Sequence, residues 1–149
     1  AYASKAECHA LAFPSFGPER RGAPVRAFTK LDSKPILDRS ETEHADYIII
    51  LDETLYSDNL QNLLKPDGKI LVNTRNAELG RIIPFDGDSL AKDLKLPVVN
   101  TVMMGALAGI SGVVSVENLH DAISHYMPEK IREKNKSAVQ KASQEAAAL

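Results

Sequence analysis

The spacing of apolar residues along this chain changes near residue 100. Before that point, short apolar runs predict strands, and the continuous β-branched run 45–51 is typical of a parallel strand covered on both faces. The predicted strands are 8–13, 23–31, 45–51, 70–73, 82–85 and 96–99. Helical spacing predicts helices at 52–64, 89–94, 100–110, 116–126 and 128–148, the last opened by a proline.

The connecting segments carry turn chemistry. Residues 32–35 and 65–69 combine Asp, Ser, Pro or Gly and predict turns, and 36–37 could continue an edge hairpin. Alternating strands and helices predict an α/β fold: a three-layer, mostly parallel, Rossmann-like sheet with helices on both faces. The length fits a single domain over 1–149. The last predicted helix is rich in Lys, Glu and Gln, so we expect it to be solvated.

Composition excludes several classes of function. With 18 Lys and Arg against 20 Asp and Glu, the net charge is −2, which argues against nucleic acid as a partner. No apolar run reaches the roughly 20 residues that span a bilayer. Cys8 is the only cysteine, which excludes a disulfide framework and a cysteine-ligated iron–sulfur cluster in this chain and fits a reducing cytoplasm. The four histidines lack metal-ligand spacing, so no metal site is predicted.

The segment 13–24 is the strongest candidate for binding chemistry. Gly17 and Gly22 allow backbone angles closed to other residues, and three prolines stiffen the loop. Arg20 and Arg21 carry planar donor forks that suit phosphate or carboxylate. The alternative is an ordinary solvated loop, because connecting segments usually lie on the surface.

A second candidate lies at the start of the helix 100–110. Asn100 and Thr101 follow a predicted strand, and ligands in such sheets bind at the carboxyl ends of strands, where helix N-terminal amides favour anions. Asn100 could equally act as a helix N-cap. If this site lies beside the arginine loop, the two form one phosphate-sized pocket. The acid-Gly-acid sequence 86–88 matches a thiamine-diphosphate motif poorly and is better explained as a turn.

Three blocks carry a resemblance to a known family. They are F-P-S-F-G-P-E-R-R-G-A-P-V-R-A-F-T-K-L at 13–31, the strand 45–52 that ends in an acid, and P-V-V-N-T-V-M-M-G-A at 97–106. In this order and spacing they resemble the gamma chain of 2-oxoacid:ferredoxin oxidoreductases, most closely the pyruvate branch. The resemblance covers essentially the whole chain. Family members open with a strand and a glycine-rich turn, and we expect both to be absent from the chain as given, which would then be N-terminally incomplete.

The resemblance implies a subunit with no catalytic residue of its own. The family's complex converts a 2-oxoacid, coenzyme A and oxidised ferredoxin into an acyl-CoA, CO2 and reduced ferredoxin. Alpha and beta chains are expected to carry thiamine diphosphate, and a delta chain iron–sulfur clusters. The gamma chain is implicated in coenzyme A handling, so the expected site residues are Arg20 and Arg21 on phosphates and Asn100 as a polar contact. The residues expected to shape that site are Ser15, Gly17, Gly22 and Thr101.

Other interpretations stay open. The chain could be a free-standing, non-catalytic module that binds a nucleotide or phosphate, or the loop could dock a neighbouring subunit through Arg20. Within the family, R-R-G-A-P favours pyruvate, while branched-chain 2-oxoacid and indolepyruvate enzymes remain alternatives.

Overall fold

The computed structural model describes residues 1–5, 7–15 and 25–149, in two compact units, Ala1–Glu43 and His44–Leu149. The first unit holds the short 3-10 helix η1 (Tyr2–Ser4) and the antiparallel pair β1 (His9–Ser15) and β2 (Arg26–Asp32). The predicted strands 8–13 and 23–31 are thereby confirmed, although they form a two-stranded sheet of their own.

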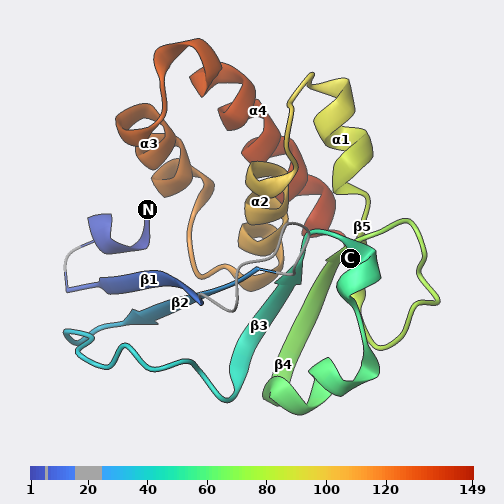
Figure 1. The fold of residues 1–149 in the computed structure, drawn as a ribbon. Coiled ribbons are helices and arrows are strands. Elements are labelled where there is room, and N and C mark those ends of the chain that lie inside the picture. Colours follow the sequence, from blue (N-terminus) through green and yellow to red (C-terminus); the bar gives the residue numbers. More distant parts are fainter. Residues whose placement is uncertain (6, 16–24) are drawn as a thin grey trace. The chain divides into compact units, whose positions relative to one another are not determined.

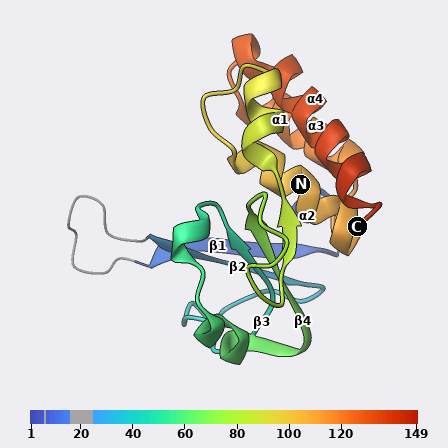
Figure 2. The ribbon, with the colours of Figure 1, turned by 90° about the vertical axis from the view of Figure 1, so that its right-hand side faces the viewer.

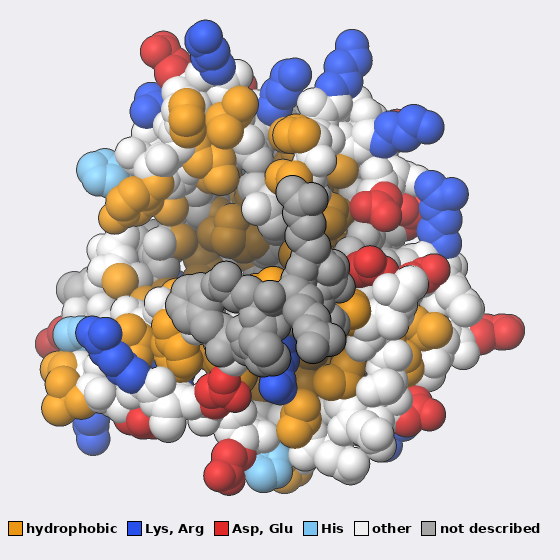
Figure 3. Space-filling view, in the orientation of Figure 1, with side chains coloured by type: hydrophobic (Ala, Val, Ile, Leu, Met, Phe, Trp, Pro, Cys, Tyr) orange, Lys and Arg blue, Asp and Glu red, His pale blue; other side chains and the backbone are white. Residues whose placement is uncertain are grey.

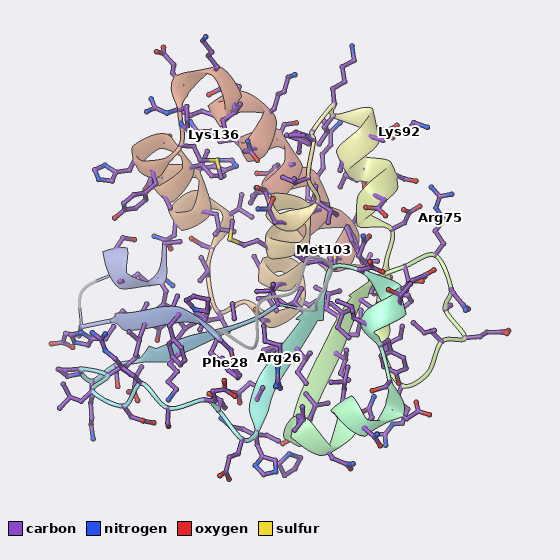
Figure 4. The ribbon with its side chains drawn as sticks, in the orientation of Figure 1. Arg26, Phe28, Arg75, Lys92, Met103 and Lys136 are labelled. Atoms are coloured by element: carbon purple, nitrogen blue, oxygen red, sulfur yellow. The ribbon has the colours of Figure 1, made fainter. Side chains whose placement is uncertain are left out.

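An aromatic pair and an ion pair hold the first unit together. Phe13 lies opposite Phe28 in the register, and the two rings stack with their centroids 5.7 Å apart; Figure 4 labels Phe28 on its strand. Lys30 Nζ lies 2.8 Å from Asp38 Oδ2 and anchors the following loop to β2. Residues 35–39 have no regular structure, so the edge hairpin suggested at 36–37 is wrong.

The second unit contains the predicted parallel sheet (Figure 1). Its order is β3 (Ala45–Ile50), β4 (Leu64–Asn73) and β5 (Ile83–Phe85), and both pairs are parallel. These strands confirm the predictions for 45–51, 70–73 and 82–85. The turn predicted at 65–69 is wrong, because β4 already begins at Leu64 and pairs with β3 through an irregular register near Ala45.

The helix predicted over 52–64 is also wrong. Two 3-10 helices occupy this segment instead, η2 (Glu53–Leu55) and η3 (Asp58–Leu63). The Asp52 side chain accepts a hydrogen bond from Thr54 N and starts η2, and Tyr56 ends it in an extended conformation. Side chain–backbone bonding of this kind competes with a regular α-helix.

Four α-helices complete the unit: α1 (Gly87–Asp93), α2 (Asn100–Ser111), α3 (Val116–Tyr126) and α4 (Glu129–Ala146). Each agrees with a predicted helix to within a few residues. The strand predicted at 96–99 is wrong. Lys95 has a φ of 54°, which turns the chain, and Pro97 has no N–H to donate to a sheet.

Both faces of the sheet are covered, but differently. Leu71 and Phe85 point into a core shared with α1, α2 and α4, which form one layer (Figures 1 and 2). On the other face, Ile50, Ile70 and Val72 pack against the 3-10 segment and the loop before β5. The α/β class with a parallel sheet is therefore confirmed. The predicted arrangement of α-helices on both faces is met only in part, because among the described residues the α-helices form this core on one face and 3-10 helices and a loop cover the other.

The helix α4 is half-buried rather than solvated, which corrects the expectation from its charge. Ala138, Val139, Ala142 and Ala146 form a buried stripe against α2, which approaches closely because Gly105 and Gly109 lack a Cβ. A Cβ on Gly109 would lie 2.3 Å from Ser143 O. The charges occupy the opposite side of the helix, and basic side chains stand out along the top of the space-filling view (Figure 3).

Candidate functional site

The carboxyl ends of β3, β4 and β5 meet at one edge of the second unit and surround a polar cleft of about 470 Å³. This is the edge at which α/β sheets bind ligands. The lining residues come from the segments that follow the three strands: Leu51, Asp52, Glu53, Thr54, Asn73, Thr74, Arg75, Asp86 and Asp88.

Two buried side chains at the end of β4 join these segments. Asn73 Nδ2 donates to Leu51 O at 3.0 Å, and Asn73 Oδ1 accepts from Asp88 N at 3.2 Å. The Thr74 hydroxyl donates to the Glu53 carboxylate. Asn73 and Thr74 are each 6% exposed. The residues after β3 and the start of α1 are therefore both held by the end of β4.

Arg75 closes the outer side of the cleft. Its Nε donates to Asp86 Oδ2 at 2.7 Å, and its guanidinium also donates to the Ser89 hydroxyl. The side chain is 74% exposed and lies beside the start of α1 (Figure 4). An ion pair this exposed adds little stability. Its main effect is to place a positive charge at the rim.

Two of the carboxylates that line the cleft, Asp52 and Asp86, have a lowered pKa. A hydrogen bond from the Thr54 hydroxyl, joined by one from Thr54 N, lowers the pKa of Asp52. Burial alone would raise the pKa of Asp86, but hydrogen bonds from Ser89 and Arg75 outweigh it and lower that pKa. Among the described residues, the lining contains four carboxylates and one guanidinium. The cleft is therefore negative at neutral pH and repels polyanions.

A second, less polar groove adjoins the cleft and contains Asn100. Its lining is Leu51, Asp88, Pro97, Val98, Val99 and Asn100. Asn100 is exposed, and its Oδ1 accepts from Thr101 N at 2.9 Å, so it satisfies a helix N-terminal amide much as an N-cap would. Helix α2 begins at Asn100 itself, with Val99 as its N-cap. Asn100 thus lines a groove with Leu51 and Asp88 beside the strand ends, although the segment 96–99 before it is not a strand.

Of the other expected site residues, the structure describes Thr101 and Ser15. Thr101 is 4% exposed and does not line the groove. Ser15 ends β1 in the first unit, where its hydroxyl donates to the Glu41 carboxylate. Gly17, Arg20, Arg21 and Gly22 lie outside the described residues. Their roles, and a common pocket with Asn100, stay predictions.

The polar end of β4 was not among the site residues predicted from the sequence. Asn73, Thr74 and Arg75 follow a strongly buried strand directly, which is the same signal that singled out Asn100 after the predicted strand 96–99. The signal was available, but nothing in the sequence indicates that the Asn73 amide reaches the segments after both neighbouring strands.

The described part of the chain shows neither a metal site nor a membrane-spanning helix. Across residues 1–5, 7–15 and 25–149, no three His, Cys, Asp or Glu side chains gather as a metal site. In the same ranges, no helix has both the length and the apolar character to cross a bilayer.

A parallel sheet with a polar cleft at its carboxyl edge defines an α/β domain whose candidate ligand site lies at that edge. The sequence model of the pyruvate ferredoxin/flavodoxin oxidoreductase family matches residues 1–145, and the chain therefore belongs to this family.

Named relatives agree with that membership. The chain is 42% identical over 135 residues to pyruvate synthase subunit PorC of Methanothermobacter marburgensis, covering 87% of this chain and 76% of the relative. It is 35% identical over 143 residues to the pyruvate/ketoisovalerate oxidoreductases common subunit gamma of Thermococcus kodakarensis, covering 88% and 77%. The crystal structure of pyruvate oxidoreductase subunit PORC from Thermotoga maritima superposes with a TM-score of 0.77 at 28% identity, covering 96% of this chain and 83% of that one.

Proposed function

We propose that this chain is the gamma subunit of a multi-subunit 2-oxoacid:ferredoxin oxidoreductase that converts pyruvate, coenzyme A and oxidised ferredoxin into acetyl-CoA, CO2 and reduced ferredoxin. The observation that carries the proposal is the 42% identity to a pyruvate synthase subunit over most of both chains. The proposed partners are alpha, beta and delta subunits in a cytoplasmic complex. Thiamine diphosphate bound by those partners would supply the decarboxylation chemistry, and their iron–sulfur clusters would carry the electrons.

Within this complex, the chain contributes to coenzyme A handling. The proposal assigns the phosphates to Arg20 and Arg21, since guanidinium forks bind phosphate in a bidentate manner. Asn100 contributes a polar contact from the second unit. Ser15, Gly17, Gly22 and Thr101 shape the site without contributing charge.

The charges of the second unit support an arrangement in which the arginine loop binds the phosphates of coenzyme A and the Asn100 groove binds another part of it. The described lining of the Asn100 groove has four apolar residues, one carboxylate and no basic side chain, and the cleft beside it is negative. Such a groove fits an uncharged part of coenzyme A, such as the pantetheine arm with its amides, better than it fits a phosphate. The phosphates are then left to the arginine loop.

The assignment is tested by steady-state kinetics of the assembled complex. Arg20→Ala should raise the KM for coenzyme A by about ten- to a hundredfold, because a hydrogen bond to a charged group is worth roughly 1.5–3 kcal/mol. Single-turnover release of CO2 from pyruvate should stay largely intact. Arg26→Ala is the matched control, because it removes an exposed arginine from β2 of the same unit.

Unchanged coenzyme A kinetics in Arg20→Ala and Arg21→Ala would remove the ligand assignment. If both variants instead fail to assemble with the other subunits, the loop serves docking. Co-purification of the chain with thiamine- and iron–sulfur-containing proteins tests the subunit proposal itself. Tight nucleotide binding by a chain that co-purifies with nothing would favour the free-standing module.

The relative from Thermococcus kodakarensis supports a second candidate. Its name describes a gamma subunit common to pyruvate and ketoisovalerate oxidoreductases. A shared subunit of this kind would place 2-oxoacid selection on the other chains. Purifying the complex through this chain and assaying it with pyruvate and 2-ketoisovalerate distinguishes a dedicated subunit from a shared one.

A further inference from the structure

One buried amide holds both sides of the groove that contains Asn100. Asn73 is 6% exposed, and its Nδ2 donates to Leu51 O at 3.0 Å while its Oδ1 accepts from Asp88 N at 3.2 Å. Leu51 and Asp88 both line this groove, and both also line the neighbouring polar cleft. Asn73 itself does not line the groove, so its influence there is indirect.

The start of α1 is built to admit this amide. A Cβ on Gly87 would lie 3.1 Å from Asn73 Oδ1, 2.7 Å from Val99 Cγ2 and 2.9 Å from Met103 Sδ. The missing side chain therefore lets the first turn of α1 close onto Asn73 and onto the residues around the start of α2. The Asp88 N–H is one of the N-terminal amides that lack a partner within the helix, and Asn73 supplies its acceptor.

We infer that Asn73 is a positioning residue for the ligand groove, setting the distance between the segment after β3 and the first turn of α1. This inference rests on the proposed function, because the ligand is the coenzyme A assigned to that groove. The amide is suited to the task, since it donates to one side and accepts from the other, and a buried polar group that loses its partners is costly.

The test uses the assembled oxidoreductase with Asn73→Ala and Asn73→Asp. The aspartate keeps an acceptor for Asp88 N but places an oxygen against Leu51 O, and it adds a carboxylate to a lining that already holds four among the described residues. Asn73→Ala removes both bonds without adding charge. Both variants should raise the KM for coenzyme A by about three- to tenfold, as expected for the loss of one or two hydrogen bonds that hold a binding surface. The KM for pyruvate and the single-turnover release of CO2 should not change.

Asn135→Ala is the matched structural control. Asn135 is also 6% exposed, and its Nδ2 donates to Ile131 O at 2.8 Å within α4, away from the groove lining. It should lower the melting temperature without changing the coenzyme A KM. If the Asn73 variants behave in the same way as Asn135→Ala, the residue is merely structural and the inference is overturned.

Asn100→Ala distinguishes a wrong positioning role for Asn73 from a wrong assignment of coenzyme A binding to this chain. A raised coenzyme A KM in Asn100→Ala with normal values in the Asn73 variants refutes the positioning role alone. Normal values in the Asn100, Arg20 and Asn73 variants together refute coenzyme A binding by this chain and the positioning role with it.

Discussion

Adding one methyl group to Gly109 tests the packing that supports the whole helical layer. A Cβ at this position would lie 2.3 Å from Ser143 O and 3.0 Å from the Ser143 Cα and carbonyl carbon. Ordinary contacts of a Cβ begin near 3.4 Å, so α2 and α4 would have to separate by about 1 Å. The obstacle is backbone, and no side-chain rotation can relieve it.

Two opposing terms set the magnitude. Alanine is favoured over glycine within a helix by up to about 1 kcal/mol. Overpacking a close-packed interior costs about 1–3 kcal/mol, and here the separation would disturb the contacts of Ala106, Ala138 and Ala142, all fully buried. We expect Gly109→Ala to destabilise the chain by about 1–2 kcal/mol, which lowers the melting temperature by roughly 3–8 °C for a protein of this size.

Thermal unfolding followed by circular dichroism measures this shift. Gly105→Ala should show a smaller loss, because its Cβ would meet Val139 O at 2.7 Å rather than 2.3 Å. Gln144→Ala, on the exposed side of α4, should lie within about 0.5 kcal/mol of the parent chain. A melting temperature for Gly109→Ala at or above that of the parent would refute the close-packing argument.

Two further predictions concern Asp52 and Asp86, two carboxylates that line the cleft. Asp86→Ala should lower the free energy of unfolding in chemical denaturation by about 1 kcal/mol, because it removes the N-cap side chain that accepts a hydrogen bond from Ser89 N. Asp86→Asn should keep most of that stability. Equal losses in the two variants would show that charge rather than capping matters. Acid should destabilise the folded chain, because the pKa values of Asp52 and Asp86 are lower in the folded chain than in the unfolded chain. The stability that these two carboxylates contribute is complete above their unfolded pKa, near 3.8, and is lost as the pH falls below that value. Melting temperatures measured from pH 6 down to pH 2.5 should therefore fall, and should fall less steeply in Asp86→Asn.

The secondary-structure elements that were predicted correctly from the sequence are those whose apolar pattern reflects only which of their own faces are buried. The end of β4 is buried on both faces, and α3 has a single apolar stripe, so each pattern reports its own burial directly. The run 45–51 forms a strand as predicted, but it is not covered on both faces, because Ile50 is buried while Ile49 is 39% exposed. The start of α2 at Asn100 was predicted because a polar residue before an apolar helical run is a recognisable helix start. These are local properties, readable without knowing the neighbours.

The mistaken segments depend on partners far along the chain. The charged composition of α4 concealed a stripe of small residues whose burial requires the two glycines of α2, more than thirty residues earlier. The leucines of 52–64 have helical spacing, but Asp52 and Tyr56 divide the segment into two 3-10 helices. In both cases a local pattern was outweighed by a tertiary or side-chain contact.

The sequence by itself determined the α/β class, the parallel strands, the helical second half and the family to which the chain belongs. Only the tertiary structure decided that the sheet edge is a negative cleft beside an apolar groove, and that Asn73 links the two segments bordering that groove. Its bonds reach residues 22 and 15 positions away, to Leu51 and Asp88. Apolar periodicity records which side of an element avoids water, whereas the partner of a buried amide depends on which distant segments the fold brings within hydrogen-bonding distance.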